Sequence, residues 1–228
     1  MANTPTLEIT TDIILIDVVD YSLLPNEEQL RTVNEIGAGL STWVHFLAEL
    51  NALRKEEVFI GFIPTGDGMY VLLNPSVCGY GLLLGLSIRN YLVWNSECFL
   101  KGLYKGVRVG INTGKMLSFD DVNGNRNYVG DGLNDCARLL KIEDQDAIAF
   151  SGDTSYVVAS ESAYYWFRQL YAGVDARRFL STIRFRISEQ KQITDKHDKT
   201  HTAYLVEASR SAAIQPPNRR PRRKRGDG

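Results

Sequence analysis

The sequence predicts an α+β fold, and two observations lead to that prediction. Short apolar runs of strand length alternate with longer segments in which apolar residues recur at helical spacing. Two of the apolar runs end in an acidic segment, at residues 17–22 and 65–69. With 228 residues, 44% of them hydrophobic and 23% charged, the chain is long enough to bury one sizeable core.

The first predicted elements are a strand over residues 7–18 and a helix over residues 25–52. Pro25 suits the first turn of a helix, and Glu27 and Glu28 suit the positive end of its dipole. Apolar residues then recur every three or four positions as far as the end of this segment.

Two short apolar runs, 58–64 and 69–73, flank Thr-Gly-Asp-Gly and predict a β-hairpin. A helix is expected over residues 79–99 and a strand over residues 107–115. The order strand, helix, hairpin, helix, strand is that of the ferredoxin-like βαββαβ unit. The predicted fold is therefore this core, extended by further helices and strands towards the C-terminus.

That extension is predicted from weaker patterns. Helices are expected over residues 131–142 and 154–170, and short strands over 147–151, 182–187 and 202–207. Beyond them the sequence loses its apolar periodicity. We therefore expect three parts: an N-terminal extension (1–7), one folded domain (8–208) and a disordered basic tail (209–228).

The two acidic segments are expected to meet. The crossover through the first helix makes the first two strands parallel, so that Asp17 and Asp67 lie at one edge of the sheet. Carboxylates beside an apolar sheet are costly unless a cation pairs with them. Each aspartate alone is better explained as a turn residue. Both together, at matched strand ends, predict a site for Mg²⁺ or Mn²⁺.

A second candidate lies in the predicted helix at residues 131–142. Asn134 and Arg138 are four residues apart and project from the same face. An amide one turn before a guanidinium can hold a sugar oxygen and neutralise phosphate charge. By spacing alone, an ordinary amphipathic helix with Arg138 in a surface ion pair explains the pattern better.

Charge and cysteine content restrict the class of protein. The net charge of −1 combines +5 in residues 219–228 with −6 in the rest of the chain. The tail is either an electrostatic arm or a solvated terminus, and the acidic body argues against nucleic acid as the main partner. Three cysteines without metal-ligand spacing, short apolar runs and no signal peptide indicate a reduced, cytoplasmic protein without a membrane span.

Four segments occur in one order along the chain: D-V-x-x-Y-S from Asp17, G-D at 66–67, R-V-G-I-x-x-G from Arg108, and G-x-x-x-N-x-x-A-R-L from Gly130. In order and approximate spacing they resemble the conserved segments of the class III adenylyl/guanylyl cyclase catalytic domain. The resemblance covers about residues 8–208. It implies a nucleotide cyclase, which is a phosphorus-oxygen lyase, with two Mn²⁺ or Mg²⁺ ions in each active site.

The resemblance also implies roles for single residues, which follow the family's motifs position by position. Asp17, Asp67 and the Val18 carbonyl match the metal ligands, and Tyr21 and Ser22 match the phosphate loop, with Asp20 in place of a usual glycine. Asn134 matches the residue that positions the ribose, and Arg138 matches the one that stabilises the transition state. Lys196 is the best match for a late lysine on the triphosphate, and Lys199 and Lys191 compete with it.

In this family the metals bind to one subunit while the asparagine and arginine come from another. The resemblance therefore implies a homodimer with two composite active sites and a nucleoside triphosphate as substrate. At the two positions that read a purine in the family, this chain has Ile63 and Asn127. Ile63 cannot hydrogen-bond a purine edge, whereas Asn127 has donors and an acceptor that suit uracil or cytosine.

A compact cyclase with such a pocket resembles the pyrimidine cyclases of Pycsar antiphage systems. There, cyclic UMP or cyclic CMP made during infection activates a separate effector. We expect UTP before CTP, and a divergent enzyme acting on ATP stays an alternative. A pseudo-cyclase that binds nucleotide without turnover would share the fold. A diguanylate cyclase is disfavoured because no Gly-Gly-Asp/Glu-Glu-Phe-like segment occurs on the hairpin, and a ferredoxin-like nucleic-acid module would need a basic body.

Overall fold

The computed structural model describes residues 6–94, 106–141, 154–172, 185–187, 190–194 and 198–209. Four sequence-based expectations lie wholly or largely outside these residues: the extension before residue 6, the strand at 147–151, Lys196 and the tail from residue 210.

The elements follow the predicted order. They are β1 (Glu8–Val19), a 3-10 turn η1 (Tyr21–Leu23), α1 (Asn26–Leu50), β2 (Phe59–Pro64), β3 (Gly68–Leu73), α2 (Gly81–Trp94), β4 (Gly106–Asp120), β5 (Arg126–Val129), α4 (Asp131–Leu139), β6 (Thr154–Ser160), α6 (Glu161–Ala172), β7 (Phe185–Ile187), β8 (Lys191–Thr194) and β9 (Thr200–Ser209).

One predicted element is wrong in its first half. Residues 154–170 were expected to be largely helical, but β6 is a strand and only α6 is a helix. The cause is tertiary: Val157 and Val158 are fully buried, and β6 has neighbouring strands on both sides. β-Branched residues suit such a buried strand better than a helix. Ser160 ends the strand and caps α6 by accepting a hydrogen bond from the Ala163 amide at 3.1 Å.

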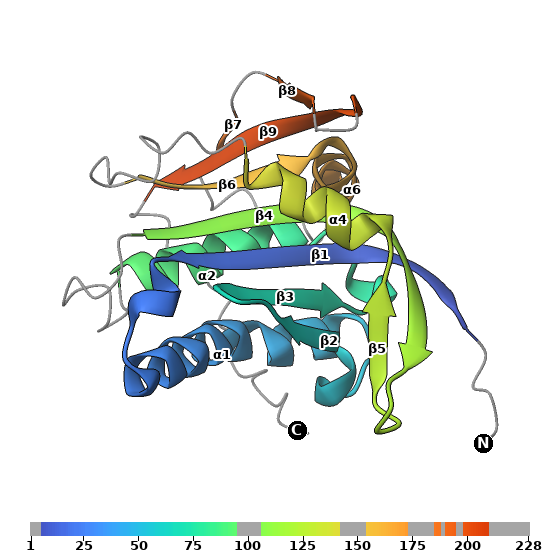
Figure 1. Cartoon of the computed structure of the whole chain (residues 1–228). Helices are drawn as coiled ribbons and strands as arrows, with labels where there is room; N and C mark the ends of the chain where they lie inside the picture. Colours follow the sequence, from blue (N-terminus) through green and yellow to red (C-terminus); the bar gives the residue numbers. More distant parts are fainter. Residues whose placement is uncertain are drawn as a thin grey trace, which may run out of the picture.

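A single mixed sheet contains all the strands, in the order β2-β3-β1-β4-β6-β9-β7, with β5 added to β4 and β8 to β9 (Figure 1). β1 is antiparallel to both β3 and β4, and β2 is antiparallel to β3. β1 and β2 therefore point in the same direction. This arrangement confirms the ferredoxin-like core and its C-terminal extension.

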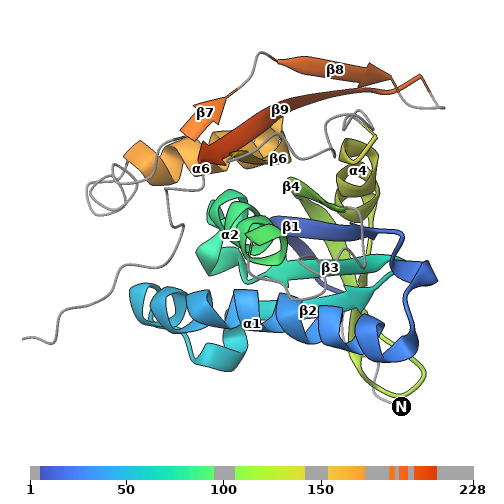
Figure 2. The same ribbon diagram turned by 90° about the vertical axis from the view of Figure 1, so that its left-hand side faces the viewer.

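The two faces of the sheet are covered differently. Figure 2 shows α1, α2 and α6 on one side and α4 on the other. Successive residues of a strand point to opposite faces, and β1 follows this rule: Ile14 and Ile16 pack under α1 and α2, whereas Ile13 and Leu15 pack under α4. The even-numbered and odd-numbered residues of β1 therefore place their side chains on opposite faces of the sheet.

The helix α2 is apolar almost throughout, with Leu82, Leu83, Leu84 and Leu86 fully or nearly fully buried. Such a helix belongs to the interior, and α2 packs against the sheet between its neighbours α1 and α6 (Figure 2). In the part of the chain that the structure describes, no helix is both long and apolar enough to cross a bilayer.

Asp12 anchors the start of α2 to the sheet. Its side chain is buried, and its Oδ2 atom accepts hydrogen bonds from the amides of Gly79 at 2.6 Å and Gly81 at 2.8 Å. Its Oδ1 atom accepts from the Thr113 hydroxyl at 2.5 Å. Burial raises the pKa of the Asp12 carboxyl above its ordinary value. A buried carboxyl with several donors fixes its neighbours strongly.

We predict that Asp12→Ala lowers the free energy of unfolding by about 3 kcal/mol or more, because several buried donors lose their acceptor. The measurement is chemical denaturation followed by circular dichroism. Thr113→Val removes one of these donors and serves as the graded control, with an expected loss of about 1 kcal/mol. A loss below 1 kcal/mol in Asp12→Ala would contradict this role of the carboxyl.

Candidate functional site

The end of β1 and the β2–β3 turn lie side by side. The Val18 amide donates to the Asp67 carbonyl at 2.8 Å, and Asp17 is paired with Gly68. A Cβ atom on residue 68 would overlap the Ile16 carbonyl oxygen. Only glycine therefore permits this approach, and the sequence Gly66-Asp67-Gly68 brings the second acidic segment to the first.

Arg108 provides the cationic partner of Asp17. It lies opposite Asp17 in the β1–β4 pairing, and its Nε and Nη2 atoms are 2.7 Å and 2.5 Å from Asp17 Oδ2. The Asp17 side chain is 18% exposed and that of Arg108 is 33% exposed. The role of Arg108 was not predicted. A signal was present in the alternation of the two strands. Asp17 lies between buried Ile16 and Val18, and Arg108 lies between buried Val107 and Val109, so each charged side chain points away from the face that its apolar neighbours occupy.

The donors at this edge suit a hard divalent cation. Asp17, Asp67 and the Val18 carbonyl offer only oxygen, which Mg²⁺ and Mn²⁺ prefer. Asp17 already attracts a positive charge, that of Arg108. Among the described residues, no group of three or more His, Cys, Asp or Glu side chains is placed to hold a metal. A cation at this edge would thus need further ligands, such as phosphate oxygens.

In the loop after β1, some side chains pack against the core and others are exposed. Asp20 has φ = 65°, in the left-handed region that glycine favours. The Tyr21 side chain packs against the core, and its hydroxyl donates to the Gln29 carbonyl at 3.3 Å. Burial also raises the pKa of Tyr21. Ser22 is exposed. The structure therefore holds Tyr21 against α1 and leaves Ser22 exposed.

α4 is fixed to the sheet by its buried side. The Cys136 thiol lies 3.5 Å from the Ile13 carbonyl oxygen and 3.4 Å from that of Gly110, and burial raises its pKa to about 12. Cys136 is thus a packing residue. Asn134 is exposed on the same helix. Arg138 donates from Nη1 to Asp135 Oδ1 at 2.6 Å.

α4 contacts β1 at Ile13 and Leu15, which lie four and two residues before Asp17. At about 3.3 Å per residue, these positions are roughly 13 Å and 7 Å away along the strand. The candidate residues thus lie on separate elements: Asp17, Val18 and Asp67 on β1 and the β2–β3 turn, and Asn134 and Arg138 on α4.

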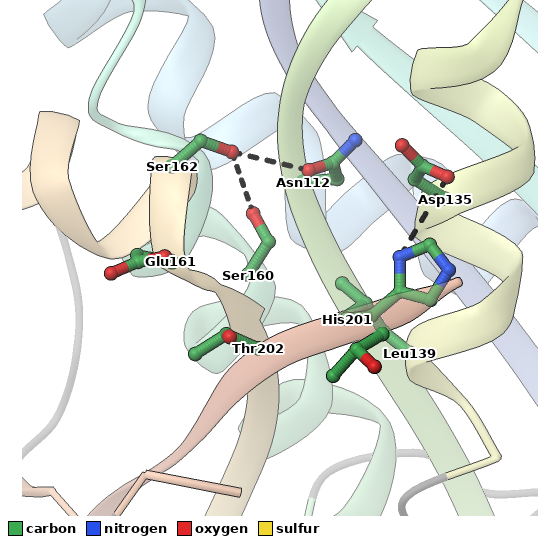
Figure 3. A pocket seen from close by; sticks show the side chains of 9 residues that line it. Asn112, Asp135, Leu139, Ser160, Glu161, Ser162, His201 and Thr202 are labelled. Atoms are coloured by element: carbon green, nitrogen blue, oxygen red, sulfur yellow. Dashed lines mark hydrogen bonds and ion pairs between the residues drawn. The ribbon is translucent and has the colours of Figure 1, made fainter. Parts of the chain in front are cut away.

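The predicted triphosphate lysine, Lys196, lies outside the described residues. Of its competitors, Lys199 reaches α4: its Nζ atom is 3.2 Å from Asp135 Oδ1 and 3.3 Å from Oδ2. Lys191 opens β8, opposite Ala203. The nearly buried His201 places Nδ1 3.8 Å from Asp135 Oδ1 (Figure 3). Neither Asp135 nor His201 was a predicted site residue, because β9 approaches α4 only in the folded chain.

A polar cavity of about 270 Å³ lies beside these residues. It opens where the parallel strands β4 and β6 separate, and Figure 3 shows its side chains converging from β4, α4, α6 and β9. Hydrogen bonds within the chain already engage several of them: Ser162 donates to the Thr113 carbonyl at 2.7 Å, and Asn112 donates to the Gly132 carbonyl at 2.9 Å.

The two predicted base-reading residues lie on contacting strands. Ile63 on β2 packs with Tyr70 and Leu133 under α4. Asn127 on β5 accepts a hydrogen bond from the amide of Tyr128 at 2.8 Å. Tyr128 joins the strands, because its hydroxyl donates to the Ile60 carbonyl at 3.2 Å. The contact of Ile63 or Asn127 with a base stays a prediction.

Neither the models of protein families nor the curated proteins match this sequence. Solved structures do. The catalytic core of a rhodopsin-guanylyl cyclase with converted specificity, in complex with ATPαS, superposes with a TM-score of 0.56 at 15% identity, over 90% of this chain and 99% of that one. The guanylyl cyclase domain of the RhoGC fusion protein from the aquatic fungus Blastocladiella emersonii, a double mutant in monomeric form, gives 0.55 at 13%, over 89% and 97%. The chain therefore has the fold of cyclase catalytic domains, as expected.

We predict that Arg108→Met strengthens Mn²⁺ binding in the absence of nucleotide. The arginine and the cation compete for the Asp17 carboxylate, and a partly exposed ion pair contributes up to about 1 kcal/mol, or a two- to fivefold change in Kd. Free Mn²⁺ is measured by electron paramagnetic resonance. Arg126→Met is the matched control, because Arg126 forms a similarly exposed pair with Asp120, 3.1 Å apart. Weaker Mn²⁺ binding in Arg108→Met alone would contradict the competition.

Proposed function

We propose that this protein is a nucleotide cyclase, which converts a nucleoside triphosphate into its 3′,5′-cyclic monophosphate and pyrophosphate. The single observation that supports it most is the meeting of Asp17 and Asp67 at one edge of a sheet with a cyclase fold. Two carboxylates and a carbonyl there suit divalent cations, and cations are what a triphosphate requires for this transfer.

In the proposed reaction, the ribose 3′-oxygen attacks the α-phosphate. A 3′-O–P bond forms, the bond between the α-phosphorus and its bridging oxygen breaks, and pyrophosphate leaves. Two Mn²⁺ or Mg²⁺ ions at Asp17, Val18 and Asp67 would lower the pKa of the 3′-hydroxyl and neutralise phosphate charge. Asn134 orients the ribose, and Arg138 stabilises the charge that develops on the α-phosphate. Ser22, the loop amides and Lys196 bind the phosphate chain.

We propose a homodimer with two composite sites. The resemblance to cyclase domains supports this, because it implies that Asn134 and Arg138 of one subunit act on a nucleotide held at Asp17 of the other. A two-fold axis produces two equivalent sites from one such arrangement.

For the substrate we propose UTP. Ile63 lies among apolar side chains and offers no hydrogen bond to a purine, whereas Asn127 can present a donor and an acceptor to a pyrimidine. CTP and ATP are the alternatives. By its resemblance to Pycsar cyclases, we further propose that the product is an antiphage second messenger, acting on a separate cyclic-nucleotide effector.

We predict that the purified protein with Mn²⁺ forms a cyclic product from UTP, at a kcat/KM at least about tenfold above that for ATP. The product is identified by mass after incubation with each of the four nucleoside triphosphates.

Asp67→Ala is the control for this assay and should lose turnover with every nucleotide. A tenfold preference for ATP would overturn the pyrimidine assignment while retaining the cyclase. Retained nucleotide binding without any product would overturn the cyclase and support the pseudo-cyclase.

We predict that Asp17→Ala and Arg138→Ala are each inactive and that mixing the two restores activity. Random exchange of subunits makes half of the dimers mixed, and each mixed dimer has one intact site of two. The expected recovery is therefore about a quarter of the wild-type rate. The rate is measured after the subunits have been exchanged at equal concentrations, and exchange is verified with differently tagged chains. No recovery despite exchange would exclude shared sites.

A further inference from the structure

Three cationic or protonatable groups from two elements converge on one carboxylate, that of Asp135. Arg138 Nη1 on the same helix lies 2.6 Å from Oδ1, Lys199 Nζ lies 3.2 Å from it, and His201 Nδ1 on β9 lies 3.8 Å from it. Figure 3 shows Asp135 and His201 facing each other across the space between α4 and β9. Asp135 therefore links the helix of Arg138 to Lys199 and to the start of β9.

The bond to Arg138 is the strongest of the three. It is the shortest, and both side chains are only about a quarter exposed, at 25% for Arg138 and 26% for Asp135. A short charge-assisted bond with limited solvent is stronger than one to the more exposed Lys199, at 54%. A guanidinium is planar, so that one bond from Nη1 restricts the plane of all five of its N–H groups.

Both ends of this link are anchored. Cys136 and Leu139 bury the sheet side of α4, which fixes the backbone that carries Asp135 and Arg138. On the other side, β9 pairs with β6 over Ser160–Thr154, and His201 is 9% exposed. Because the backbone of α4 is fixed, the bond to the carboxylate restricts where the guanidinium points.

We infer that Asp135 is a positioning residue for Arg138. This inference rests on the proposed cyclase function. Its carboxylate holds the guanidinium in one orientation. Without that bond, the guanidinium is less restricted and meets the developing phosphate charge less often. The loss then falls on the transition state more than on substrate binding.

The test uses the full chain with its best nucleotide substrate and Mn²⁺. Asp135→Asn is nearly isosteric and removes the charge, and we expect kcat to fall about 10- to 100-fold while KM changes less than about threefold. Asp131→Asn is the matched control, since Asp131 is an exposed acidic residue in the first turn of the same helix. It should stay within about twofold of wild type in kcat. Wild-type kcat in Asp135→Asn would overturn the inference.

A double-mutant cycle separates positioning from a merely structural effect. If Asp135 acts through Arg138, Asp135→Ala combined with Arg138→Lys should be no slower than Arg138→Lys by more than about threefold. Multiplied losses in the double variant would show that Asp135 acts elsewhere and would overturn the inference.

A second readout does not depend on turnover. The Nε–H resonance of Arg138, assigned by its loss in Arg138→Lys, is followed by ¹⁵N relaxation without nucleotide. We expect a rigid side chain in wild type and in Asp131→Asn, and a mobile one in Asp135→Asn. Equal mobility in all three would overturn the inference. If wild type is inactive on all nucleotides, the proposed function fails, and this measurement still tests whether Asp135 holds Arg138.

Discussion

The backbone contact between the end of β1 and the β2–β3 turn is the constraint on which the candidate site depends. It consists of the Val18–Asp67 hydrogen bond and the close approach of Gly68 to Ile16. Two carboxylates separated by 50 residues of sequence, Asp17 and Asp67, are thereby placed at one edge. A partly buried carboxylate such as that of Asp17 is stabilised by a nearby positive charge. Arg108 provides such a charge from β4.

The two aspartates of β1, Asp12 and Asp17, lie in different environments. Asp12 and Asp17 are five residues apart and so lie on opposite faces. Asp12 is buried, has its acceptors filled by backbone amides and a hydroxyl, and holds α2 in place. Asp17 remains partly exposed and is paired with the Arg108 guanidinium. The first carboxylate stabilises the fold, whereas the second lies at the candidate site.

The two sides of α4 also differ in their environment. Its buried side, with Cys136 and Leu139, fixes the helix over β1, β4 and β6, while its outer side presents Asn134 and Arg138. The contact between Asp135 and the β8–β9 turn connects this helix to the C-terminal strands. The C-terminal extension therefore supports residues of the candidate site as well as completing the sheet.

Local pattern was enough to predict the βαββαβ core and the meeting of Asp17 with Asp67, because strand direction follows from the crossover through α1 and from the hairpin. It was not enough for β6, whose buried valines were assigned to a helix, nor for the short strands β5 and β8. Nor did the sequence predict the partners Arg108, Asp135 and His201. Their roles depend on which strands become neighbours and which face a helix covers. Such contacts join residues up to 91 positions apart, as between Asp17 and Arg108, and only the packed sheet determines them.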